Sequence, residues 1–265
     1  MKLKEKEKKY IYYVRTYRRI QADYVYGTLY FIFVVLPPLL LLVTHIDSVT
    51  KALCNFSLKA IKGALPSLDI SIAESYYMPF GSMSCLSFDS QMPSPHELLI
   101  NLIIIMAVIS LILISSHAGK PLAVYLLFSF LVHIISCVYF VFETEKFVFT
   151  ADDFSGIFMK QQIGIWILFI ILMGIVTGFL GNKGLGYKIS GFIAVLLYSA
   201  VFGVLRYTVF MFVLAKFSLL YMADIMFTFG PLFDFLYLVM IYSIYADRIQ
   251  RIYDSAEGKG EWRWL

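Results

Sequence analysis

The sequence predicts an all-α integral membrane protein: a bundle of about six transmembrane helices with a structured outer loop between the first two. Two observations lead to this class, the overall composition and a series of long apolar stretches. Hydrophobic residues make up 60% of the 265 positions and charged residues only 15%, and the mean hydropathy is +0.78. A soluble domain cannot bury that much apolar surface, because part of any globule faces water. The chain is therefore expected to lie largely in lipid.

Six stretches are long and apolar enough to cross a bilayer, which takes about 20 residues at a rise of 1.5 Å each. They are Gly27–Thr44, Leu98–Ser115, Pro121–Phe142, Gln161–Leu180, Ile189–Ala215 and Gly230–Ala246. The first stretch is not followed by a small-residue cleavage site, which favours a retained helix over a signal peptide. The fifth stretch is longer than a bilayer requires, so we expect it to tilt or to end early.

The distribution of lysine and arginine predicts the orientation of these spans. Eight such residues lie in the first 26 positions, and with the N-terminus inside, the inner segments hold fifteen and the outer segments six. Both termini are therefore expected in the cytoplasm, in a cell (inner) membrane. The predicted organisation is a basic cytoplasmic leader (1–26), a six-helix domain (27–246) and a cytoplasmic tail (247–265). The leader suits an anionic membrane face better than nucleic acid.

The long outer loop, residues 45–97, is predicted to begin with an amphipathic helix. From Asp47 to Leu65 the apolar residues follow helical spacing, and lysines occupy the opposite side. Asp47 or Ser48 can cap its start. Two placements stay open: the helix lies on the outer membrane surface, or it packs on the protein's own spans.

The rest of this loop is too aromatic for a free linker. Its segment ESYYMPFGSMSCLSF is expected to fold back onto the spans or onto a partner. Cys54 and Cys85 both lie in the loop, where an oxidising compartment would allow them to pair. Two free thiols are the equally weighted alternative.

A single arginine interrupts the fifth apolar stretch, in SAVFGVLRYTVFMFVLA. A charge inside a bilayer is costly, so Arg206 is expected to face the bundle interior and to have a polar partner. Asp234 and Asp224 are the candidate ion-pair partners, and Gln161 with its neighbour Gln162 can hydrogen-bond across helices. Three interpretations stay open: a site that holds an anion, a buried pair that fixes two helices, or an arginine that extends outward to the membrane surface.

His133 and Cys137 form a second candidate site. They are four residues apart and share one helix face. A thiol beside an imidazole can become a thiolate nucleophile, with Arg206 steadying an oxyanion. The alternative is a small apolar residue near a histidine that bonds a neighbouring helix. No metal site and no cofactor are predicted, because Asp152 and Asp153 have no third ligand and the other histidines lack metal-like spacing.

The second half of the chain carries three further motifs. They are the outer FSG at 154–156, two spans joined by a glycine-rich basic turn, and VFGVLRYTVF followed by a last span with FGPLFDF. Over 154–245 this pattern resembles the exosortase/archaeosortase family of membrane-embedded cysteine transpeptidases. In that family cysteine precedes the Ser-Gly, asparagine lies three residues before the arginine, and a histidine begins the last helix. Here Phe154 and Gly203 occupy two of these positions and the histidine is missing. The resemblance thus implies the family's fold and its arginine, Arg206, without the usual nucleophile and acid.

Two functions follow from these observations. The first is a non-enzymatic polytopic subunit of a membrane assembly, in envelope polysaccharide or protein export or anchoring. Its partners would be membrane lipids and other membrane-protein subunits, with no nucleic acid. The aromatic outer loop, the basic leader and the incomplete catalytic set favour it. The second is an exosortase-like transpeptidase, or a handler of an anionic lipid-linked substrate, centred on Arg206.

Overall fold

The computed structural model describes residues 18–20, 23–114, 120–179, 181–254 and 262–264. Within these residues, six helical segments are long and apolar enough to cross a bilayer, and the predicted all-α membrane fold is confirmed. The predicted leader 1–26 and tail 247–265 lie partly outside the described residues. The predicted inner loop SSHAGK also lies outside them except for Lys120, which begins α6.

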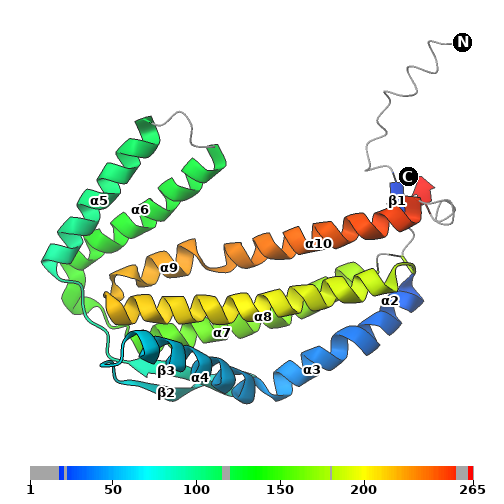
Figure 1. The fold of residues 1–265 in the computed structure, drawn as a ribbon, viewed down its shortest axis with the longest axis horizontal. Helices are drawn as coiled ribbons and strands as arrows, with labels where there is room; N and C mark the ends of the chain where they lie inside the picture. Colours follow the sequence, from blue (N-terminus) through cyan, green and yellow to red (C-terminus); the bar gives the residue numbers. More distant parts are fainter. Residues whose placement is uncertain (1–17, 21–22, 115–119, 180, 255–261, 265) are drawn as a thin grey trace, which may run out of the picture. The chain divides into compact units, whose positions relative to one another are not determined.

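The helices follow one another along the chain with mostly short connections (Figure 1). Their bounds are α2 Tyr24–Tyr30, η2 Phe31–Val35, α3 Leu36–Thr44, α4 Ile46–Ala64, α5 Pro95–Ile114, α6 Lys120–Glu143, η3 Thr144–Lys146, α7 Ala151–Gly178, α8 Leu185–Lys216, η4 Leu219–Tyr221, α9 Met222–Thr228 and α10 Pro231–Asp254. The strands are β1 Arg18–Ile20, β2 Ile70–Tyr77, β3 Gly81–Phe88 and β4 Trp262–Trp264. β1 pairs with β4 and β2 pairs with β3, both antiparallel.

Two of the spanning segments begin well before the residue that the sequence predicted. α7 begins at Ala151 rather than Gln161, because Thr150 and Asp153 cap its start reciprocally. The Thr150 backbone N–H donates to Asp153 Oδ2 at 2.9 Å, and the Asp153 N–H donates to Thr150 Oγ1 at 3.2 Å. The last apolar segment begins at Leu219 rather than Gly230, because a short helix, α9, precedes the break where α10 begins.

The chain forms two compact units, and α3, α7, α8 and α10 contribute residues to both. The first unit comprises 1–39, 169–195 and 239–265. In it the first span packs closely on α7, because Gly174 and Gly178 leave room for its side chains. A Cβ added at Gly174 would lie 2.5 Å from a methyl carbon of Val35, and one at Gly178 would lie 3.0 Å from the Tyr30 ring. Small residues four apart are a common device for close helix approach in membranes.

The second unit comprises 40–168 and 196–238. Its β2–β3 hairpin pairs in register from Ile70 opposite Phe88 to Tyr77 opposite Gly81. The helix α4 packs on β3, and α5 and α6 form a helical hairpin whose second helix packs on α9 (Figure 1). This unit holds every residue of the candidate sites below.

The structured loop between the first two spans consists of α4 and the β2–β3 hairpin, residues 46–88, which we call the α4–hairpin module. The buried face of α4 includes Cys54 and Ser57, and Ser57 Oγ lies 2.7 Å from Thr208 Oγ1 in α8. Of the two placements left open for this helix, packing on the protein's own elements is the one observed. The aromatic segment forms strands, which the sequence did not predict. Cys54 and Cys85 are buried and free.

Candidate functional site

Arg206 lies in α8 with 6% of its surface exposed, inside the second unit. Its Nη1 lies 2.7 Å from Oδ2 of Asp234, which is 1% exposed in the first turn of α10. The same nitrogen donates to the backbone carbonyls of Phe229 at 3.2 Å and Gly230 at 3.1 Å. Nη2 donates to Gln162 Oε1 in α7 at 2.7 Å. The guanidinium therefore connects three helices and the break between α9 and α10.

The break supplies acceptors because the chain leaves helical geometry there. The last carbonyls of α9 have no intrahelical partner, and Pro231 at the start of α10 lacks a backbone N–H. A Cβ added at Gly230 would lie 2.1 Å from the Met226 carbonyl oxygen, so only glycine fits at this position. The local sequence FGP thus brings two carbonyls within reach of the Arg206 guanidinium: that of Phe229, and that of Gly230, which also accepts from the Phe233 N–H at 3.2 Å.

Gln162 contacts Arg206, whereas the sequence singled out its neighbour Gln161. The two side chains leave α7 in different directions, and Gln162 is only 1% exposed. The approach depends on Gly203 in α8, where an added Cβ would lie 2.8 Å from Gln162 Cδ. Helix phase is the signal that identifies it: Gln162 falls on the same buried face of α7 as Ser155 and Trp166.

The network continues beyond the carboxylate. The Tyr237 hydroxyl lies 3.0 Å from Asp234 Oδ1 and 2.8 Å from Ser199 Oγ. Three buried polar atoms beside the ion pair have no hydrogen-bond partner among the described residues: Gln161 Oε1, Gln162 Nε2 and Arg206 Nε. Buried polar groups normally have partners, so this centre has spare capacity to bind a small polar group.

Asp224, the other candidate partner of Arg206, belongs to a different cluster. It accepts hydrogen bonds from Ser129 at 3.2 Å and Thr228 at 2.8 Å, and its Oδ2 lies 3.9 Å from His133 Nδ1. His133 Nε2 lies 3.3 Å from Asn101 Oδ1. These residues come from α5, α6 and α9, so the cluster joins the α5–α6 hairpin to the last spanning segment.

His133 and Cys137 lie together on α6, and both are buried. His133 contacts Asn101, Asp224 and the Tyr221 ring, whose centroid is 5.3 Å away. Within the described part of the chain, no hydrogen bond or ion pair connects either residue to Arg206. The structure thus separates the two candidate sites that the sequence treated as one catalytic set.

Tyr207, which follows Arg206, makes a third set of contacts that sequence reasoning missed. Its hydroxyl lies 2.7 Å from Ser155 Oγ and accepts from the backbone N–H of Leu86 in β3 at 2.9 Å. Cys54 Sγ lies 4.0 Å from the same oxygen. Burial raises the pKa of the Cys54 thiol to about 12 and, less strongly, that of Cys85. Successive residues of α8 therefore fasten α10 on one side and the α4–hairpin module on the other.

Among the described residues, no group of three or more His, Cys, Asp or Glu side chains is placed to hold a metal ion. Comparison with known proteins finds no matching family model, curated protein or solved structure. The exosortase/archaeosortase resemblance accordingly stays a prediction. Function has to be argued from the geometry of the chain itself.

Proposed function

We propose that this membrane-embedded protein is a non-enzymatic, polytopic subunit of a membrane assembly in export or anchoring at the cell envelope. This proposal depends on the observation that groups within the chain itself balance the charge of Arg206. Its charge meets Asp234, two backbone carbonyls and Gln162. An arginine held in this way fixes helices to one another, and it supports a rigid scaffold.

The α4–hairpin module is the part that would meet a partner. The turn of its hairpin presents Tyr76 and Met78, which are 62% and 76% exposed. Large apolar side chains gathered at one exposed turn are typical anchors of protein interfaces. In the proposed orientation both termini face the cytoplasm of the inner membrane, and this module lies on the opposite side.

A double variant at the hairpin turn tests this function. Tyr76→Ser with Met78→Ser removes the exposed anchors and spares the packing of β3 on α4. In complexes purified from the protein's native membranes, we expect a stoichiometric associated subunit with the wild type and at least about fivefold less of it with the variant. Met92→Ser, at an exposed methionine outside the turn, is the matched control and should retain the subunit. A wild-type chain that purifies alone would contradict the proposal.

A second candidate function rests on the unpartnered atoms beside Arg206. Gln161 Oε1, Gln162 Nε2 and Arg206 Nε surround the ion pair without hydrogen bonds. Two of these atoms, Gln162 Nε2 and Arg206 Nε, are hydrogen-bond donors, and they favour a site for an anionic lipid-linked substrate, as the exosortase-like motifs imply.

Gln161→Ala separates the two functions, because it removes an unpartnered atom and leaves the Arg206–Asp234 pair intact. For a scaffold, the variant should unfold at the same temperature as the wild type or slightly above it. For a substrate site, it should weaken binding of a short-chain polyprenyl phosphate, measured by native mass spectrometry. Undetectable binding of this lipid by the wild type would dismiss the second function.

A further inference from the structure

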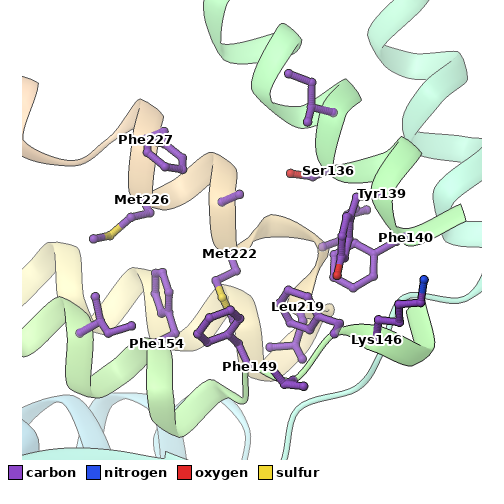
Figure 2. A pocket seen from close by; sticks show the side chains of 16 residues that line it. Ser136, Tyr139, Phe140, Lys146, Phe149, Phe154, Leu219, Met222, Met226 and Phe227 are labelled. Carbon is purple, nitrogen blue, oxygen red and sulfur yellow. The ribbon is translucent and has the colours of Figure 1, made fainter. Parts of the chain in front are cut away.

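A second feature of the same unit is a pocket of about 590 Å³ between α6, α7 and α9 (Figure 2). This volume lies within the range of about 300–1,000 Å³ that is usual for ligand sites. Phe140 lines it from α6, Phe154 and Ile157 from α7, and Met222 and Met226 from α9. All five belong to segments long and apolar enough to span the membrane.

The chemistry of the lining is divided between an apolar interior and a charged edge. Lys146 is the one charged residue of the lining, and it comes from η3, directly after the end of α6. Its side chain is 76% exposed, and its Nζ lies 2.6 Å from Oε2 of Glu143. Tyr139 and Phe147 stand at the same end, with ring centroids 6.0 Å apart. Aromatic residues next to a helix end are typical of the membrane–water interface.

We propose that this pocket binds one acyl chain of a bilayer phospholipid whose head carries both a phosphate and an ammonium group, the chemistry of phosphatidylethanolamine. The chain enters among Phe154, Met222 and Met226, where it contacts apolar atoms. The phosphate meets Lys146 and the ammonium meets Glu143. This inference does not rest on the proposed assembly.

Charge complementarity between the edge of the pocket and the lipid favours this head group. Lys146 and Glu143 form an exposed ion pair, which holds its two side chains only weakly. A zwitterionic head replaces that pair with two charge-assisted contacts and leaves no charge unmatched. A purely anionic head would meet the Glu143 carboxylate with like charge, and a neutral head would use neither residue.

Photo-crosslinking tests the proposal on the full chain in dodecyl maltoside micelles. The probes carry a diazirine on one acyl chain and are phosphatidylethanolamine, phosphatidylglycerol and diacylglycerol. We expect capture to fall in that order, with crosslinks in 135–140 and 222–227. Ala223→Trp fills the pocket and should lower capture of the first probe about tenfold. Lys146→Gln should lower it about threefold to fivefold without changing diacylglycerol capture.

Matched controls make the outcome decisive. Ala200→Trp places the same side chain at an exposed position of α8, and Lys59→Gln removes an exposed lysine of α4; both should capture like the wild type. Ile157→Trp fills the pocket from α7 and replaces Ala223→Trp if that variant does not fold. Equal capture by a pocket-filled variant and Ala200→Trp would overturn the site. Diacylglycerol or phosphatidylglycerol captured as well as phosphatidylethanolamine would overturn the head-group assignment.

Discussion

Arg206 is the residue on which the packing of the second unit depends most. Moving a guanidinium and a carboxylate out of water costs several kcal/mol, and that cost is recovered only where the geometry is good and other hydrogen bonds complete the pair. The 2.7 Å approach to Asp234 and the contacts to two carbonyls and Gln162 meet this condition. Removing one member of the Arg206–Asp234 pair should therefore destabilise the protein more than replacing both members with apolar residues.

Asp234→Asn should destabilise the protein by about 3 kcal/mol, because it leaves the Arg206 charge buried without a counter-charge. The double variant Arg206→Met with Asp234→Leu should lose less than either single variant. The thermal unfolding midpoint of the full chain in detergent micelles measures each change. A double variant as unstable as the sum of its parts would show that the two residues act independently.

Gly203→Ala should break the hydrogen bond between Gln162 and Arg206, because the new Cβ would lie 2.8 Å from the Gln162 amide. We expect a loss of about 1–2 kcal/mol. In a Gln162→Ala background the same substitution should cost much less, since the obstructing side chain is gone. Thermal unfolding of the wild type, the two single variants and the double variant measures these costs. An equal cost of Gly203→Ala in both backgrounds would mean that the loss does not come from a clash with the Gln162 side chain.

The Cys54 thiol should be almost unreactive in the folded protein. Burial raises its pKa to about 12, so at pH 9 the folded state holds about a thousandfold less thiolate than an ordinary cysteine exposed by unfolding. The pKa of the Cys54 thiol is higher in the folded state than in the unfolded state. The stability that the buried, protonated thiol contributes is therefore complete below about pH 9 and is lost as the pH rises toward 12. Maleimide labelling of a Cys85→Ala, Cys137→Ala variant at pH 9, with and without denaturant, measures it. Rapid labelling without denaturant would contradict the burial.

Among the elements, the long helices were predictable and the hairpin was not. Apolar length alone identifies all six spanning segments, and helical spacing identifies α4. The hairpin escaped because β2 alternates only briefly, at Ile70 and Ile72, and because β3 is buried along much of its length. Its turn at Pro79–Gly81 was the available signal. Helix phase could have placed Gln162 on the buried face of α7, but its pairing with Arg206 depends also on the rotation of α7 relative to α8, which spacing does not give.

Polar contacts from α7 and α8 hold the hairpin to the spanning helices. Asp152 accepts from Ser87 Oγ at 2.7 Å and from the Phe88 N–H at 3.1 Å, and the Tyr207 hydroxyl accepts from the Leu86 N–H at 2.9 Å. Tyr207→Phe should leave the Leu86 N–H without its acceptor and cost about 2 kcal/mol. Hydrogen exchange in the peptide 81–88 should become at least about tenfold faster, while α5 is unchanged. Tyr198→Phe, at a hydroxyl that is partly exposed, is the control and should exchange like the wild type. Unchanged exchange at β3 would mean that α4 and the Asp152 contacts hold the hairpin without the Tyr207 hydroxyl.

At the scale of the whole molecule, the described residues hold six apolar segments, and if all six cross the bilayer, the residues before the first and after the last lie on one side of it. The α4–hairpin module and η3 then share the opposite side, as does the turn between α8 and η4. The native cysteines are buried, so new cysteines can report the side without background labelling. The excess of lysine and arginine near the chain ends predicts that this side is cytoplasmic.

Single cysteines at four exposed positions test this topology in full. Lys51→Cys and Lys146→Cys should react with a membrane-impermeant maleimide in intact cells, because α4 and η3 lie on the outer side in the predicted orientation. Asn182→Cys and Arg251→Cys, in the turn before α8 and near the end of α10, should react only after the membrane is permeabilised. Labelling is read on gels after quenching, with total labelling in detergent as the reference for each variant. If Asn182→Cys and Arg251→Cys reacted in intact cells and Lys51→Cys and Lys146→Cys did not, the orientation would be opposite to the predicted one, with every span still crossing the membrane. A split within either pair would mean that one apolar helix fails to cross, because only an odd number of crossings can place two such positions on opposite sides.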